Sequence, residues 1–379
     1  MKKTAAIFLL VFLIHCTATK NTSRTATINP YAYTTHKKTI SKNGVVVSAH
    51  TLASSVGVSV MKQGGNAIDA AIATQLALAV VYPNAGNIGG GGFMVARLAN
   101  GQTVALDYRE MAPSAASRDM YLDKNGNVME GKSVNGHLSS GVPGTVAGLF
   151  ESAKYAKLPF SKLIQPAIDL AEKGFVITQN EANTFNKLQD DLNKYNTVPS
   201  VFQQRQWKAG DTLIQTDLSN TLKRIRDDGA KGFYEGTTAT LIAAEMKRGG
   251  GILSMDDLKN YTAKWRTPHS FNYKGYTVVG MPMPSSGGLL IHQMMKMVED
   301  KPLADYGFAS PRSVQLMVEA ERRAYADRAQ YMGDADFYKV PQEQLTSDAY
   351  LKERMKDYHP GIAGNSSNVK PGVIAVKEL

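Results

Sequence analysis

The sequence predicts a folded chain that mixes α-helices with short β-strands. Its 379 residues are 43% hydrophobic, which is enough to bury a large core in one big domain or two smaller ones. Runs with helical spacing are separated by shorter runs in which apolar and polar residues alternate. There is no internal repeat and no interior linker that would divide the chain, so we expect one continuous domain over residues 44–358.

Residues 1–16 have the features of a secretory signal. Met1-Lys2-Lys3 supplies a charged start, and the apolar run from Ala5 to Ile14 is too short to span a bilayer. We therefore expect export to the periplasm or the cell exterior. Cys16 is the only cysteine, so no disulfide can form within the chain. A lipid on Cys16 would anchor the protein to a membrane, but His15 stands where a small residue is usual, and ordinary cleavage nearby is the alternative.

The charge balance bears on the kind of partner. The net charge is +10, from 43 Lys and Arg against 33 Asp and Glu. The basic residues are scattered, without the dense basic run or the interleaved aromatic residues that a nucleic-acid groove needs. The excess therefore indicates a solvated basic surface, and we expect no nucleic-acid partner.

The first predicted elements form a helical hairpin. Residues 17–43 are polar and aperiodic, so we expect a flexible leader before the domain. The apolar Val45-Val46-Val47 predicts a short strand. Helical spacing follows from Thr51 to Lys62 and from Ala67 to Val81. Gly64-Gly65-Asn66 between them supplies a helix C-cap and then an N-cap.

A β-hairpin comes next. The alternating runs from Gly92 to Leu98 and from Gln102 to Tyr108 are joined by Ala99-Asn100-Gly101, and Asn-Gly is a strong signal for a hairpin turn. Arg109 directly follows the second strand. Residues 359–379 are rich in Gly, Pro, Asn and Ser, which predicts a mobile tail. Between these regions we expect successive helices from residue 143 to about residue 195, including helices over 144–157 and 161–174. Helical spacing resumes over 219–248, 287–299 and 314–332, and a strand pair is expected over 271–273 and 276–279.

Three motifs resemble known sites without their required companions. Gly89 to Gly92 would suit a phosphate-binding loop, but no Lys-Ser/Thr pair and no helix follow, so we expect these glycines to let another backbone or a small substrate approach closely. Pro284 to Gly288 lacks the first glycine of a nucleophile elbow, and Ser285 or Ser286 is better explained as a helix N-cap. Ser59 to Lys62 matches Ser-x-x-Lys but lacks the partner motifs.

Histidine and acidic residues are the candidates for metal ligands and acid-base groups. The seven histidines have no spacing typical of a metal site, so we expect neither a catalytic metal nor a cofactor. Neighbouring acidic residues could form a carboxylate pair, but the basic residues beside them favour ion pairing along a helix face. The acidic residues are Glu319, Glu321, Asp327, Asp334 and Asp336, and the basic ones are Arg322, Arg323 and Arg328.

Arg109 is the main candidate for a binding role. It stands at a strand end, and Ala112-Pro113 stops the run that follows it. The planar guanidinium can hold a carboxylate through two hydrogen bonds. The residues alone leave two interpretations open, a substrate carboxylate or an internal ion pair with Asp107 or Glu110.

Six stretches carry a family signature when they are taken together and in order: GGNAIDAA (64–71), NIGGGGFM (87–94), DYREMAP (107–113), GVPGTVAG (141–148), PSSGG (284–288) and EAERRAYADRAQYMGDAD (319–336). In this order they resemble the large subunit of bacterial γ-glutamyltranspeptidases, also called glutathione hydrolases. The similarity runs from about residue 44 to about residue 341. No single stretch is decisive, but six in register make the resemblance specific.

The resemblance implies an N-terminal-nucleophile hydrolase, an α+β protein built as a four-layer αββα sandwich from one precursor that cuts itself in two. In that family the first threonine of the small subunit attacks the γ-glutamyl carbonyl, and the acyl group passes to water, an amino acid or a peptide. Glutathione and other γ-glutamyl peptides or amides would be the substrates, and the small subunit would be a partner. Arg109 matches the residue that binds the α-carboxylate of the γ-glutamyl group. No catalytic residue is then assigned in this chain, because the threonine is expected just after Leu379, whose carbonyl would be attacked during self-cleavage.

Two alternatives stay open. The cephalosporin and glutaryl acylases share the architecture that the resemblance implies. The other alternative is a truncated, inactive chain that at most binds γ-glutamyl compounds, although half of a sandwich would expose an apolar face and unpaired strand edges. Thr34-Thr35-His36 repeats the Thr-Thr-His of the family's nucleophile, but it precedes the domain and we interpret it as a coincidence.

Overall fold

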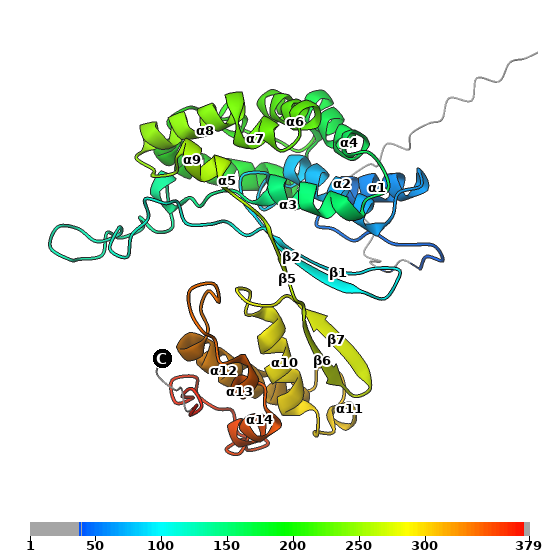
Figure 1. Cartoon of the computed structure of the whole chain (residues 1–379), viewed down its shortest axis with the longest axis vertical. Coiled ribbons are helices and arrows are strands. Elements are labelled where there is room, and N and C mark those ends of the chain that lie inside the picture. The colour runs from blue at the N-terminus through cyan, green and yellow to red at the C-terminus, as the bar shows by residue number, and fades with distance from the viewer. Residues whose placement is uncertain (1–37, 39, 375–379) are drawn as a thin grey trace, which may run out of the picture.

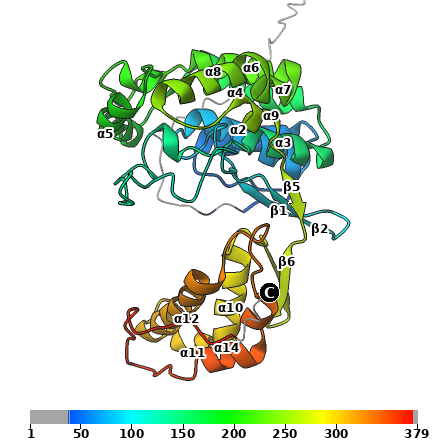
Figure 2. The same cartoon turned by 60° about the vertical axis from the view of Figure 1, so that its left-hand side comes forward.

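The computed structural model describes residue 38 and residues 40–374. Figure 1 shows two groups of helices with strands between them. Residues 51–259 supply the helices on one side of a three-stranded sheet, and residues 269–354 supply a strand pair and the second group of helices on the other side. Figure 2 shows the same order of layers after a turn about the vertical axis.

The helical hairpin has the bounds that the sequence predicts. It consists of α1 (Thr51–Lys62) and α2 (Ala67–Val81). Gly64 between them has φ +96°, a conformation that favours glycine, and the Asn66 side chain accepts the N–H groups of Ile68 and Asp69 to begin α2. Most residues of α2 are buried, because other helices pack around it.

The rest of the first group surrounds α2 and shares one large hydrophobic core with it. A two-stranded pair, β3 (Phe175–Val176) with β4 (Thr212–Leu213), lies in the same region. Among the described residues, no helix combines the length and the apolar character that crossing a membrane requires. The helices are α3 (Thr145–Ser152), α4 (Phe160–Lys173), α5 (Gln179–Tyr195), α6 (Thr216–Asp228), α7 (Lys231–Tyr234), α8 (Gly236–Gly249) and α9 (Met255–Lys259).

The central sheet has three antiparallel strands. The predicted hairpin is confirmed as β1 (Phe93–Arg97) and β2 (Thr103–Asp107), with Phe93 opposite Asp107. β5 (Lys264–Arg266), which the sequence did not predict, pairs with the other edge of β2. This strand continues towards the second helical group, so it connects the two groups (Figure 1).

The second group packs two helices beside the other strand pair. The strands are β6 (His269–Tyr273) and β7 (Tyr276–Gly280), which confirms the predicted pair. Both contact α10 (Gly287–Val298), which also packs against α12 (Pro311–Tyr331). The short helices of this group are α11 (Leu303–Tyr306), α13 (Gln342–Leu345) and α14 (Asp348–Arg354).

The predicted strand at Val45-Val46-Val47 is wrong for the described residues. Val45 and Val47 are exposed, whereas Val46 is half-buried against Gly57 of α1. The alternation typical of a strand is therefore present. No neighbouring strand of the described chain pairs with it, and a strand needs the hydrogen bonds of a neighbour.

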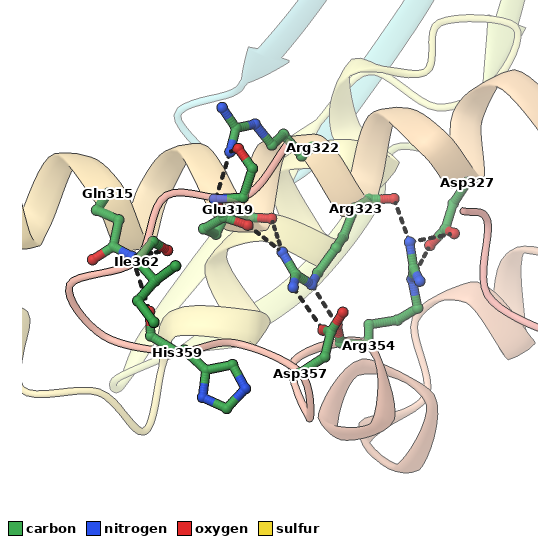
Figure 3. A network of polar contacts seen from close by, with 10 residues as sticks. Gln315, Glu319, Arg322, Arg323, Asp327, Arg354, Asp357, His359 and Ile362 are labelled. Atoms are coloured by element: carbon green, nitrogen blue, oxygen red, sulfur yellow. Dashed lines mark hydrogen bonds and ion pairs between the residues drawn. The ribbon is translucent and has the colours of Figure 1, made fainter. Parts of the chain in front are cut away.

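The segment after α14 runs along α12 (Figure 3). The mobile tail that the sequence predicts over residues 359–379 stays a prediction for the segment as a whole. Residues 375–379, including Leu379, lie outside the described residues. Three side chains of α12 hydrogen-bond to backbone groups in the described part of this segment. Gln315 donates to the carbonyl oxygens of His359 and Ile362, Glu319 accepts the Gly364 N–H, and Asp327 accepts the Gly372 N–H.

Candidate functional site

An open pocket of about 420 Å³ lies where the two helical groups meet. Its walls come from the end of β2, from β5, from the turn before α10 and from the end of α12 with the loop that follows. Three of the six stretches that carry the family resemblance contribute lining residues, namely 107–113, 284–288 and 319–336. The charged lining side chains are Asp107, Arg109, Glu110, Lys264, Arg266, Arg328, Asp334 and Asp336.

The Arg109 side chain is exposed at this pocket, two residues after β2 ends. Its guanidinium carbon lies 6.0 Å from the centre of the Phe93 ring. Within the described residues it forms no salt bridge, so the expected alternative of an internal pair with Asp107 or Glu110 is wrong. Asp107 pairs with Arg266 instead, at 2.8 Å between Oδ2 and Nε. The Arg109 guanidinium is therefore free to bind an anion that enters the pocket.

The backbone of Arg109 is held from two sides. Its N–H donates to Oδ1 of Asp107 at 3.1 Å, and its carbonyl oxygen accepts the Tyr261 hydroxyl at 2.7 Å. Tyr261 is buried and stacks parallel to Tyr234. Burial raises the pKa of the Tyr261 hydroxyl, so it stays protonated and can donate. The point from which the Arg109 side chain extends is thus set by β2 and by a residue far along the chain.

The glycines from Gly89 to Gly92 lie against the segment that carries Arg109. A Cβ added at Gly91 would lie 2.5 Å from the carbonyl oxygen of Tyr108 and 2.9 Å from the carbonyl carbon of Arg109, closer than a real Cβ comes. A carbonyl of the run also accepts the Gly144 N–H at 2.7 Å. The expected close approach of another backbone is confirmed, and the run leads into a strand rather than the helix that a phosphate-binding loop requires.

Ion pairs connect β5 with the loop after α12. Arg266 contacts both carboxylate oxygens of Asp336 at 2.9 Å, and Lys264 Nζ lies 2.6 Å from Asp336 Oδ2. The Arg266 hydrogen bonds, followed by the Lys264 bond, hold the pKa of Asp336 well below its usual range. Asp336 is therefore ionised at neutral pH, and one wall of the pocket is tied electrostatically to the other.

The turn before α10 holds a third arginine of the pocket, Arg328 of α12, in place. Ser286 occupies the predicted N-cap position, but its hydroxyl accepts Arg328 Nε at 3.0 Å and does not cap the helix. Ser285 Oγ accepts the Gly287 N–H at 3.3 Å instead. Arg328 is therefore held beside Pro284 at the rim of the pocket.

Glu319 and Asp327 of α12 are engaged in ion pairs, as the sequence predicts, whereas Glu321 forms no salt bridge within the described residues. Glu319 contacts Arg322 at 2.5 Å and Arg323 at 2.7 Å. Asp327 is fully buried and pairs with Arg354 at 3.1 Å. These residues hold the second helical group together, and none of them lines the pocket.

Several expectations cannot be placed in the described residues, and several site residues were missed. Cys16 and Leu379 lie outside the described residues. Among the described residues, the structure contains no group of three His, Cys, Asp or Glu side chains that could hold a metal ion. The sequence does not predict the contacts of Tyr261 and Arg266 with the Arg109 segment, because neither spacing nor periodicity shows contacts between distant positions. Asp336 was expected to pair along a helix face, but it lies in the loop after α12 and pairs with Lys264 and Arg266 of β5. β5 has three residues, too few to show an alternating pattern.

The γ-glutamyltranspeptidase family model matches residues 53–371. The glutathione hydrolase proenzyme of Escherichia coli K12 is 46% identical over 348 residues, which cover 89% of this chain and 59% of that protein. An acylase ACY 1 proenzyme of Pseudomonas sp. strain V22 is 35% identical, over 87% of this chain and 62% of that protein. This chain therefore spans about three fifths of the length of these curated relatives.

Solved structures agree with the sequence comparison. The crystal structure of Helicobacter pylori γ-glutamyltranspeptidase matches with a TM-score of 0.84 and 45% identity, over 88% of this chain and 97% of the solved one. A γ-glutamyltranspeptidase from Pseudomonas nitroreducens complexed with L-DON matches with a TM-score of 0.80 and 40% identity, over 86% and 98% of the two chains. These matches confirm the predicted α+β fold of the N-terminal-nucleophile hydrolases.

Proposed function

Because the chain belongs to the γ-glutamyltranspeptidase family, we propose that it forms the part of a γ-glutamyltransferase and glutathione hydrolase that binds the γ-glutamyl group. The observation that carries this proposal is Arg109, whose guanidinium forms no salt bridge with any described residue, lies at an open pocket and extends from a backbone held at two points. Such a fork suits a substrate α-carboxylate, which it can hold by two parallel hydrogen bonds.

The substrates follow from this binding mode. A γ-glutamyl compound carries a free α-carboxylate at the end that is not cut, so Arg109 would fix that end while the γ-amide bond is attacked. Glutathione, other γ-glutamyl peptides and γ-glutamyl amides all present this end. Water would accept the acyl group in hydrolysis, and an amino acid or peptide amine would accept it in transfer.

We place the attacking group on a second subunit cut from the same precursor. Relatives named proenzymes extend well beyond the region that this chain matches, which leaves room for such a subunit. The α-amine of a threonine would take the proton of its own hydroxyl as the hydroxyl oxygen attacks the γ-carbonyl, and it would pass this proton to the amine that leaves when the C–N bond breaks. The threonine is proposed to follow Leu379, whose carbonyl would take part in self-cleavage.

Export is a further part of the proposal. The charged start and the short apolar run of residues 1–16 support a secretory signal, with the periplasm or the cell exterior as destination. Cys16 would carry a lipid anchor if the signal is of the lipoprotein type. An exported hydrolase would act on glutathione and related compounds outside the cytoplasm.

Replacing Arg109 with Lys tests the binding role. An ammonium cannot reproduce the two-pronged contact, so KM for a γ-glutamyl anilide should rise roughly 10- to 100-fold, the equivalent of losing about 1.5–3 kcal/mol from a charged hydrogen bond. Steady-state kinetics of the full-length gene product measure this. Arg118→Lys is a matched control, because Arg118 is highly exposed and lies outside the pocket lining. An unchanged KM in R109K would remove Arg109 from the substrate site.

An acylase activity is the second candidate, favoured by the ACY 1 relative. A glutaryl group ends in the same carboxylate as a γ-glutamyl group but lacks the α-amine, so Arg109 suits both. The higher identity to the glutathione hydrolase favours the γ-glutamyl substrate. Initial rates on matched γ-glutamyl and glutaryl anilides decide between them, and faster glutaryl cleavage would make the protein an acylase.

A further inference from the structure

Asp107 connects the Arg109 backbone to another arginine. Its Oδ1 accepts the Arg109 N–H at 3.1 Å, and its Oδ2 accepts Arg266 Nε at 2.8 Å. Arg266 of β5 lies opposite Ala105 of β2. Ala105 precedes Asp107 by two residues, so the Arg266 and Asp107 side chains are on the same face of the sheet. Only 8% of the Asp107 side chain is exposed, so water cannot easily replace either partner. The carboxylate cannot turn without losing one of these hydrogen bonds.

Arg266 is held in turn by the second helical group. Its two terminal nitrogens bind both oxygens of Asp336 at 2.9 Å each, and only 16% of its side chain is exposed. A two-pronged contact of this kind fixes the plane of the guanidinium as well as its position. The position of the loop that carries Asp336 therefore bears on the orientation of Asp107.

We propose that Asp107 and Arg266 are positioning residues, which hold the Arg109 backbone so that its guanidinium faces the pocket, and that Asp336 sets Arg266 from the second helical group. The identity of the bound anion rests on the proposed γ-glutamyl function, whereas the positioning itself does not. A purely structural ion pair would stabilise the sheet and leave the Arg109 N–H and the substrate preference unchanged. The two roles therefore give different results in the measurements below.

Amide hydrogen exchange tests the positioning directly and without any substrate. In Arg266→Met of the full-length gene product, Asp107 loses the partner that fixes it, so the Arg109 N–H should exchange on the order of 10-fold faster. The Tyr108 N–H, which donates to the Gly92 carbonyl at 3.1 Å, serves as an internal control and should change little. Equal protection of the Arg109 N–H in the wild type and R266M would overturn the proposal.

Substrate preference tests the consequence for binding. The ratio of kcat/KM for a γ-glutamyl anilide to that for a 4-aminobutanoyl anilide, which lacks only the α-carboxylate, reports the Arg109 contact. In R266M this ratio should fall roughly 10-fold, less than the hundredfold that a displacement of ~1 Å can cost. Arg266→Lys keeps the charge without the fork and should give an intermediate ratio. A ratio equal to that of the wild type in R266M would contradict the positioning role.

A matched control separates positioning from general destabilisation. Arg323 also bridges two carboxylates, Glu319 and Asp357, but it lies in the second helical group outside the pocket lining. Arg323→Met should therefore keep the wild-type substrate ratio even if it lowers stability. If R266M does not fold, Asp336→Asn replaces it in both measurements. The Asp336 side chain is more exposed than that of Arg266, and removing its charge still frees Arg266 from the second helical group.

The outcomes distinguish this inference from the proposed function. A wild-type protein that does not cleave γ-glutamyl compounds would defeat the proposed function, while the hydrogen exchange of the Arg109 N–H would still decide the positioning. A wild-type protein that cleaves them, with R266M unchanged in both exchange and ratio, would defeat the positioning alone.

Discussion

Asp327 of α12 joins several segments of the second helical group. Its buried carboxylate pairs with Arg354, accepts the Gly372 N–H at 2.9 Å and accepts Gln293 Nε2 at 3.2 Å (Figure 3 shows the Arg354 contact). Three separate segments, α10, α14 and the chain after α14, therefore meet at one charge. Because a buried charge that loses its partner is costly, this residue should dominate the local stability.

Asp327→Asn should lower the free energy of unfolding by about 3–5 kcal/mol, since it leaves the Arg354 guanidinium buried without a counter-charge. Urea unfolding followed by circular dichroism measures the change. Combining it with Arg354→Met should restore part of the loss, because the second change removes the unpaired charge. Asp227→Asn, at an exposed pair with Arg226, is the control and should leave the midpoint unchanged. A midpoint for D327N that matches this control would show that the network carries little stability.

At the scale of single residues, the sequence predicted Arg109 and missed its partners. A strand-end arginine before Ala-Pro is visible in a few consecutive letters, and the resemblance assigned its role. Tyr261 and Arg266 reach the same place only because β5 pairs with β2, a contact between residues more than a hundred positions apart. Such pairing depends on the folded sheet, and composition and spacing do not encode it.

At the scale of elements, the contact between β6 and α10 makes this part of the molecule sensitive to acid. His269 Nε2 lies 3.0 Å from His292 Nδ1, and His292 stacks on Phe271 with ring centres 4.1 Å apart. Burial lowers the pKa of both histidines, that of His292 to about 4, with smaller effects from His269 and Lys296. The folded state therefore favours neutral His269 and His292. If both facing ring nitrogens carried a proton, two N–H donors would point at each other.

This lowered pKa sets a direction for the pH dependence of stability. The unfolded chain takes up protons near the ordinary histidine pKa of about 6.5, whereas folded His292 resists them down to about 4. The stability is thus fully present above about pH 6.5 and is lost as the pH falls towards 4. His292→Gln should weaken this loss, measured as the difference in urea midpoint between pH 7 and pH 5. His359→Gln, at an exposed ring, should keep the wild-type difference, and an H292Q profile identical to the wild type would contradict the assignment.

The elements that the sequence predicted are those whose signal is local. Both helices of the first hairpin were predicted with their observed bounds, since Gly64 and Asn66 end one and begin the other. The strand expected at Val45-Val46-Val47 failed because pairing is not a local property. β3, β4 and β5 are two or three residues long, and only their partners define them.

At the scale of the whole molecule, the central sheet is incomplete within the described residues. β1 and β5 pair with β2 on one side only, so each leaves an unpaired edge. Val95 of β1 and Trp265 of β5 are also substantially exposed. Open edges with apolar residues need a cover or they aggregate. The small subunit that the proposed function calls for would supply such a cover, and this agrees with relatives that are longer than the matched region.

Mass spectrometry of the untagged protein from its own gene tests whether such a subunit exists. We expect two associated polypeptides, the second beginning with a threonine directly after Leu379, because the proposed chemistry needs a free α-amine beside the attacking hydroxyl. The first polypeptide should have lost residues 1–15 and carry a lipid on Cys16 if the signal is of the lipoprotein type, or begin nearby without a lipid otherwise. The matched control is the same precursor with that threonine changed to Ala, which should stay uncut. One polypeptide ending at Leu379, with no partner, would leave a chain that keeps the Arg109 pocket but has no group to attack the γ-carbonyl.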